Sequence, residues 1–491
     1  MYCSIFTCGS IYDLLRGKAC CKIYIGQGEK MNSFIIKDKS FYQKLFAIAI
    51  PMAVQNLINI AVNLLDTVML GQLGEVAMSA SSLGGQLGFM YMIINMGLTA
   101  GASVLTSQYW GRGDTDAIRK TMSMTYKISL ALSFVFMAVA MAVPQFILSI
   151  YTNDAEVIVS GAKYLQVISM TYLLSGVTMT TLNMLRTVGT VKISLYVYGS
   201  SFFVNIFFNY ALIFGKFGFP QLGVVGAAAA TVIARFVEMC IVLLYLLKYD
   251  EKVRFRPSDL KSKIDKEVFK IYIKYGLPVL CNEMLWSLGN SVLSIIMGHM
   301  GKEFVAANSI CGVMMQCITF ATHGINSAAA VLAGNTIGEG KYELARKQAL
   351  TLFVMSIGIG FFTCGLTIIL KKPLVSFYNI TAQTQAITLE MLNAMALVNI
   401  FQSVASINMF GTLRGGGDSK FVAVMDVGSM WLLSVPLGWI AGLVMHRPAG
   451  IVYICLKATT IFECFAAAFR ILSGKWVKDV TRSEKEQARN L

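Results

Sequence analysis

The stretch PMAVQNLINIAVNLLDTVMLGQLG at residues 51–74 decides the fold, because a related stretch, PVLCNEMLWSLGNSVLSIIMGHMG, occupies residues 278–301. The two align without a gap, and each begins with proline and ends with glycine. A second block, further along each copy, repeats Arg186 as Arg414. Self-similarity over such a period indicates two related halves. Because both halves are apolar, the repeat predicts a duplicated membrane bundle, an architecture common among transporters.

The composition is that of a membrane protein. Of the 491 residues, 56% are hydrophobic and 14% are charged, whereas soluble domains average about 25% charged residues. The net charge of +15 does not indicate a nucleic-acid partner, because the basic residues lie in short loops and form no continuous stripe with aromatic residues. The 11 cysteines and three histidines show no metal-type spacing, so no metal centre is expected.

Hydropathy and loop punctuation predict twelve membrane helices, at 44–70, 77–107, 121–143, 157–181, 192–214, 222–247, 268–299, 304–336, 347–370, 385–411, 419–443 and 450–473. The expected fold is an all-α integral membrane protein of two parallel six-helix bundles. We expect an N-lobe at 44–247, a cytoplasmic linker at 248–267 and a C-lobe at 268–473. A cytoplasmic leader at 1–43 and a cytoplasmic tail at 474–491 flank them.

Residues 1–30 form an unusual start to the leader. They lack an apolar core followed by a small-residue cleavage site, so they do not predict a signal peptide. Gly28-Glu29-Lys30 precedes Met31, and the purine-rich codons of these residues resemble a ribosome-binding site. We therefore favour Met31 as the start, with Met1 as the alternative that N-terminal sequencing would reveal.

Alternate loops are basic, which gives the expected orientation. Arg119-Lys120, Arg346-Lys347 and the stretch 248–270 lie on one side. The opposite loops carry few basic residues: Lys216, Lys302, Lys371, Lys372 and Arg447. Because basic loops face the cytoplasm, both termini are expected inside, and the protein is expected in the cytoplasmic membrane. Each half then crosses an even number of times, so the repeats are parallel.

Several polar residues in the predicted spans of the first half are candidates for cation binding. Asp66 is the only acidic residue of the first span, and a carboxylate inside a membrane helix is costly unless it faces a partner, water or an ion. A structural hydrogen bond is the alternative. Asn205 and Asn209 share one helix face and either bind a cation or link helices. Thr231 follows a small-residue run, which is typical of close helix packing.

Other intramembrane charges suggest further roles. Arg235 and Glu238 lie three residues apart and are expected to form a structural ion pair. Glu283 is an isolated carboxylate in the seventh span and, with Trp286, is the substrate candidate of the second half. Asp426 either joins this polar site or pairs with a basic loop residue. No set of nucleophile and base can be assembled, so an enzyme is not expected.

These motifs resemble the multidrug and toxic compound extrusion (MATE) family of the MOP superfamily, with bacterial NorM-like and DinF-like members. The resemblance covers residues 31–476. It rests on DTVMLG at 66–71, the Gly-x-Gly loops at 111–113 and 338–340, and LRGGGD at 413–418. It implies two bundles around a V-shaped cavity and cation-coupled export by alternating access.

The resemblance also assigns residues. Asp66 stands at the first-helix aspartate of the family, and Asn205 and Thr231 match its N-lobe cation site. Asn209 falls where that site often has a second aspartate. The NorM-like members carry an aspartate where this chain has Ser403, and Glu283 lies about one turn before their seventh-helix glutamate. A NorM-like C-lobe sodium site is therefore not expected, and the coupling ion stays open between H⁺ and Na⁺.

The expected function is an antiporter that exports small amphipathic organic cations. It is expected to act as a monomer in the lipid bilayer, without a cofactor other than the coupling ion. The alternative is a lipid-linked precursor flippase of the same superfamily, whose members often have additional spans or many basic residues in the cavity. A receptor or channel fits a parallel duplication less well.

Overall fold

The computed structural model describes residues 35–261, 263–378 and 380–481, and every regular element within these ranges is a helix. Ten helices are long and apolar enough to cross a membrane, and two bent helix pairs raise the number to twelve if each pair is one span. This confirms the all-α membrane fold that the hydropathy pattern predicts. The interpretation of residues 1–30 as a mistaken start lies outside the described residues.

The first half begins earlier than its hydropathy suggests, because Asp38 caps the first helix by accepting a hydrogen bond from the Ser40 amide, 2.9 Å. The predicted span 157–181 is two helices, bent by 40°. The helices of this half are α2 (Lys39–Gly71), α3 (Glu75–Arg112), α4 (Thr115–Ala142), α5 (Pro144–Ser149), α6 (Ala155–Ile168), α7 (Met170–Thr187), α8 (Lys192–Phe214) and α9 (Val224–Lys248).

The second half contains stretches of wider π-helix, a feature that often marks functional sites. Its last span is bent by 45°. The helices are α12 (Leu277–His299), α13 (Lys302–Gly338), α14 (Tyr342–Ser376), α15 (Ala382–Ala405), η1 (Ser406–Leu413), α16 (Ser419–Ser429), η2 (Met430–Ser434), α17 (Val435–Trp439), η3 (Ile440–Val444), α18 (Ala449–Leu456) and α19 (Ala458–Leu472). The linker carries one short helix, α10 (Pro257–Lys261), and α11 (Lys266–Tyr275) leads from its end into α12 as part of the same candidate span.

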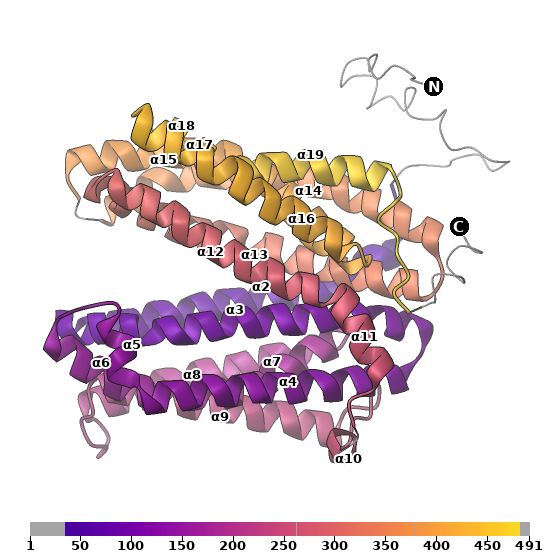
Figure 1. Ribbon diagram of the computed structural model, residues 1–491, viewed down its shortest axis with the longest axis horizontal. Coiled ribbons are helices and arrows are strands. Elements are labelled where there is room, and N and C mark those ends of the chain that lie inside the picture. The colour runs from indigo at the N-terminus through magenta and orange to yellow at the C-terminus, as the bar shows by residue number, and fades with distance from the viewer. Residues whose placement is uncertain (1–34, 262, 379, 482–491) are drawn as a thin grey trace.

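The two halves form two bundles that lie side by side (Figure 1). Helices α2 to α9 make one bundle and α12 to α19 the other, and α2 and α3 pack against α12 and α13 across the interface. The bundles approach each other at the end where α11 lies and diverge toward the end with α5 and α18 (Figure 1).

Two glycines close the interface at the end with the basic loops. A Cβ on Gly111 of α3 would lie 2.0 Å from the carbonyl oxygen of Asn335, and one on Gly338 of α13 would lie 2.0 Å from that of Gln108. Any side chain would collide with backbone, so only glycine permits this crossing. Gly111 and Gly338 occupy the same position in the two copies of the repeat. The duplication therefore preserves the contact that brings the lobes together.

The tail that follows α19 crosses from the C-lobe to the N-lobe. The side chain of Gln108 on α3 donates to the Lys478 carbonyl, 3.0 Å, and accepts from the Val480 amide, 2.7 Å. Trp476, at the start of the tail, is fully buried and packs over Gly416. We call residues 476–481 the tail strap, because they link the two lobes beside the glycine crossing.

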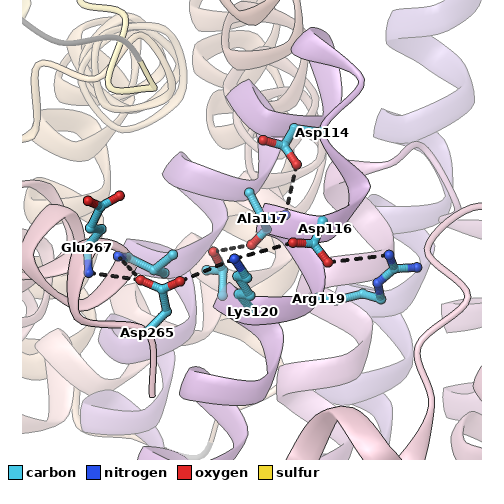
Figure 2. A network of polar contacts seen from close by, with 9 residues as sticks. Asp114, Asp116, Ala117, Arg119, Lys120, Asp265 and Glu267 are labelled. Carbon is cyan, nitrogen blue, oxygen red and sulfur yellow. Dashed lines mark hydrogen bonds and ion pairs between the residues drawn. The ribbon is translucent and has the colours of Figure 1, made fainter. Parts of the chain in front are cut away.

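A network of charges links the linker to the N-lobe at the same end (Figure 2). The Lys120 ammonium lies 3.3 Å from Asp116 Oδ2 and 3.2 Å from Asp265 Oδ2. Asp265 also caps α11 by accepting from the Glu267 amide, 2.9 Å. That amide and the Lys120 ammonium together hold the pKa of Asp265 below its ordinary value.

Candidate functional site

The N-lobe site is a group of one carboxylate and two amides inside the bundle. The amide nitrogen of Asn209 on α8 donates to Asp66 Oδ1 on α2, 2.5 Å, and to Asn205 Oδ1, 2.9 Å. Both asparagines are buried, whereas Asp66 is partly accessible. The spacing of four residues places the two amides on one face of α8. The structure thus brings together three of the four residues that the sequence predicts.

The oxygens of this group can accept a proton or a small cation. Asn209 Oδ1 is buried without a hydrogen-bond partner, near the carboxylate of Asp66 and beside Asn205 Oδ1. A buried acceptor without a donor is costly and commonly marks a binding position. Hard cations take carboxylate and amide oxygens as ligands.

Thr231 is not part of this hydrogen-bonded group. Its hydroxyl donates to the Ala227 carbonyl one turn earlier on α9, 3.0 Å. Within the described residues no hydrogen bond joins it to Asp66. This local bond is typical of threonine inside a helix, and a part for Thr231 in cation binding stays a prediction.

The charged pair on α9 lies near the carboxylate of the N-lobe site. Arg235 Nη1 lies 2.8 Å from Glu238 Oε1 and 2.9 Å from its second oxygen. Arg235 and Tyr164 are also within electrostatic reach of Asp66. Because Glu238 pairs with Arg235, the carboxylate of Asp66 is not needed to balance that arginine.

The C-lobe carries a larger polar cluster. Asn282 of α12 donates to Asp426 Oδ2 of α16, 2.9 Å, and both side chains are buried. Arg414, which follows η1, bonds Glu283 Oε1 of α12 through Nη1, 2.8 Å. Asp426 lies within electrostatic reach of Arg414, so both expectations for this carboxylate, a place in the polar site and a basic partner, stay predictions.

Glu463 of α19 belongs to the same cluster and is a residue that the sequence analysis missed. It is 3% exposed, and its carboxyl group lies close enough to that of Asp426 for the two to share a hydrogen bond. Two carboxyl groups share a hydrogen bond only when one of them is protonated. The signal was present in the sequence, since Glu463 is a lone acidic residue in an apolar span, as Asp66 is.

The two predicted substrate residues of α12 lie in different places. Glu283 lies at the interface between the lobes, and Trp286 lies at the protein surface. A Cβ on Gly97 of α3 would lie 3.3 Å from Glu283 Cγ, so Glu283 lies at the lobe interface. Trp286, one turn further along α12, is 40% exposed, and Met284 is also exposed. A role for these side chains in substrate binding stays a prediction.

An all-helical membrane fold of two repeats, with a separate buried polar group in each lobe, is that of a membrane transporter. The family described as MatE matches residues 51–211 and 278–440, one match in each lobe. The chain belongs to this family. The family resemblance seen in the sequence is thereby confirmed, and membership makes the chain a transport protein rather than an enzyme.

The curated relatives cover nearly the whole chain. The chain is 28% identical over 459 residues to the probable multidrug resistance protein NorM of Thermotoga maritima, covering 89% of this chain and 93% of the relative. It is 23% identical over 416 residues to the multidrug resistance protein MdtK of Yersinia enterocolitica, covering 84% of this chain and 89% of the relative.

Solved structures agree with the fold. One, a MOP superfamily transporter from Pyrococcus furiosus, has a TM-score of 0.80 at 16% identity and covers 89% of this chain and 97% of its own. Another, described as the outward-facing conformation of a multidrug resistance MATE family transporter, has a TM-score of 0.80 at 16% identity, with coverages of 91% and 100%. At this identity the likeness concerns the fold alone.

Proposed function

We propose that the protein is a cation-coupled antiporter that exports amphipathic organic cations from the cytoplasm. The names of the relatives NorM and MdtK support multidrug export. The observation that carries the coupling is the group of Asp66, Asn205 and Asn209, a carboxylate held inside a membrane lobe by two buried amides. The coupling ion is H⁺ or Na⁺, and the protein acts as a monomer in the cytoplasmic membrane.

The way the lobes meet supports alternating access. With the basic loops on the cytoplasmic side, the glycine crossing shuts the cytoplasmic end of the interface. Helix α2 connects cation binding with the arrangement of the lobes. It carries Asp66 against α8 and also packs against α13 of the other lobe. A cation that binds Asp66 competes with the Asn209 amide. It favours whichever lobe arrangement binds it more tightly.

In this scheme the coupling ion binds in the N-lobe and the substrate binds at the C-lobe side of the interface, and the two binding events are coupled. The cationic group of a substrate is drawn to Glu283 at the lobe interface, where it competes with Arg414. The apolar part lies on the exposed side chains of Met284 and Trp286 on α12. Release to the outside and cation entry then alternate, so that one molecule leaves for each return of the coupling ion.

Dye efflux in inverted membrane vesicles tests the proposal. The full-length protein is compared with Asp66→Asn and with Glu156→Gln, an exposed acidic residue at the start of α6. An imposed pH or sodium gradient is expected to drive accumulation of a fluorescent organic cation in the wild type and in Glu156→Gln. Asp66→Asn is expected to lose it while the protein still reaches the membrane. Undiminished gradient-driven transport in Asp66→Asn would contradict the proposal.

A further inference from the structure

A cavity of about 130 Å³ lies between the two lobes, and it shares only Arg414 with the polar groups described above. It is bounded by α3 and α7 of the N-lobe and by α13 and the end of η1 in the C-lobe. Its lining includes two arginines but no aspartate or glutamate, within the part of the chain that the structure describes. The polar lining residues are Ser103, Ser107, Asn183, Arg186, Thr187, Asn326, Ser327 and Arg414.

The two arginines are repeat partners, one from each half of the chain. Arg186 Nε is buried and has no hydrogen-bond partner, and no ion pair to Arg186 occurs among the described residues. Its ionisable neighbour is Tyr198, a phenol and therefore not a counter-ion at neutral pH. Arg414 bonds Glu283 through Nη1, but its Nε and Nη2 are buried without partners. Both guanidinium groups thus line the cavity, one from each lobe, and neither has all of its N–H groups paired within the protein.

Several of the other polar side chains of the lining already have hydrogen-bond partners. Ser103 donates to the Ala100 carbonyl, 2.7 Å, and Ser107 to the Val104 carbonyl, 3.1 Å. Asn183 donates to Thr99 Oγ1, 3.1 Å. The groups that still need partners are therefore the guanidinium groups, and they need acceptors.

Water alone can accept hydrogen bonds from these groups, but it leaves the charge of Arg186 uncompensated in a low-dielectric interior. An anion satisfies the N–H groups and the charge together. The planar fork of a guanidinium matches the two oxygens of a carboxylate or a phosphate, and such charge-assisted pairs are the strongest hydrogen bonds in proteins.

We propose that this cavity binds an oxyanion, a phosphate or carboxylate group, between Arg186 of the N-lobe and Arg414 of the C-lobe. The bound group connects the lobes near the glycine crossing and stabilises the shut interface. Its binding goes beyond the proposed function and does not depend on it, because occupancy is measured without transport.

Thermal unfolding of the purified full-length protein in detergent, titrated with inorganic phosphate at constant ionic strength, tests the proposal. A saturable rise in Tm is expected for the wild type. Arg186→Gln is expected to weaken the apparent affinity at least about tenfold, as the loss of one charge-assisted hydrogen bond implies. Arg447→Gln, which removes an exposed arginine outside the cavity, is expected to leave it unchanged.

Two further variants keep the test decisive if Arg186→Gln does not fold. Arg186→Lys retains the charge without the fork and is expected to bind phosphate more weakly. The double variant Arg414→Gln/Glu283→Gln removes the second arginine without leaving Glu283 unpaired and is expected to weaken binding as well. A wild type without a saturable phosphate effect, or unchanged affinity in both further variants, would overturn the proposal.

A second arm distinguishes the source of the oxyanion. Hexyl phosphate carries the same charged group on an apolar chain. If it raises Tm at lower concentrations than inorganic phosphate, and this effect depends on Arg186, the site takes the head group of an amphiphile. If only inorganic phosphate acts through Arg186, the site takes a free ion. Either result supports the oxyanion site. If the effects of both probes are unchanged in the Arg186 variants, the proposal is contradicted.

Discussion

In the N-lobe, Tyr198 of α8 lies within electrostatic reach of Arg186 on α7 and Arg235 on α9. Two cations therefore flank a phenol, and one of them, Arg235, is balanced by Glu238 at 2.8 Å. The separate carboxylate of Asp66 is held by neutral amides. With these side chains ionised, the two arginines are matched by two carboxylates, Glu238 and Asp66.

In the C-lobe, Arg414 and Asp426 align with Arg186 and Tyr198 in the repeat, and Glu463 of α19 lies close to them. They form a cluster in the same way, since Asp426 is within reach of Arg414 and hydrogen-bonds to Glu463. With Glu283, three carboxyl groups lie around Arg414, whereas Arg186 has no acidic partner among the described residues.

The two lobes share the glycines of their interface but differ in their ionisable residues. The glycines that close the interface recur in both lobes, because any side chain there would prevent the lobes from meeting. Positions that carry an ionisable side chain in one lobe can also carry one in the other lobe, but the charge of that side chain can differ. Asp66 itself has Leu293 as its repeat partner, and Leu293 is buried in the apolar core of the C-lobe. We infer that the scaffold serves both lobes alike and that the lobes bind different ions.

The largest effects are expected where the lobes are alike. Gly111→Ala and Gly338→Ala each place a Cβ 2.0 Å from a backbone carbonyl oxygen, so each should destabilise the shut interface by about 3 kcal/mol or more. The two variants should lower Tm to a similar extent. Gly199→Ala and Gly358→Ala are the controls, because nothing lies within 4 Å of the added Cβ. If only one of the two variants lowers Tm, the two glycines do not contribute equally to the interface.

The next effect is expected from removing one partner of each buried ion pair. Glu238→Gln leaves Arg235 without its partner. Glu283→Gln leaves Arg414 near two other carboxyl groups, Asp426 and Glu463. Because Arg235 is about one third exposed, we expect a loss of about 1–3 kcal/mol for Glu238→Gln and a smaller loss for Glu283→Gln. Chemical unfolding of the two variants measures the difference. Equal losses would show that the C-lobe carboxyl groups do not compensate Arg414.

The shared proton of the C-lobe gives a spectroscopic difference between the lobes. Infrared spectra at neutral pH are expected to contain the band of a protonated carboxyl group, which Glu463→Gln should remove, because the new amide can donate to Asp426 without a proton. Asp66→Asn should leave this band in place. If Glu463→Gln leaves the band and Asp66→Asn removes it, the proton lies in the N-lobe instead.

The fold and part of the N-lobe site could be predicted because they depend on local patterns. Apolar runs give the spans, and the spacing of Asn205 and Asn209 places them on one helix face. The partners of Asp426 could not be predicted, because they come from α12 and α19, and only packing brings these helices together. The tail strap gave no signal either, since its hydrogen bonds use backbone groups that every residue carries.

The smallest effect is expected from the contact between the linker and the N-lobe (Figure 2). Asp265→Asn keeps a capping side chain on α11 but loses the ion pair with Lys120, and exposed pairs contribute at most about 1 kcal/mol. Because the folded pKa of Asp265 is below its ordinary value, its contribution is present above the unfolded pKa of about 3.9 and disappears as pH falls through the folded pKa. The difference in Tm between wild type and variant should therefore be small at pH 7, shrink in high salt and vanish on acidification.

Glu343→Gln is the matched control, because its ion pair with Arg346 lies within one helix of the C-lobe. A Tm difference for Asp265→Asn that persists in high salt would mean that Asp265 joins the linker to the N-lobe by more than its charge.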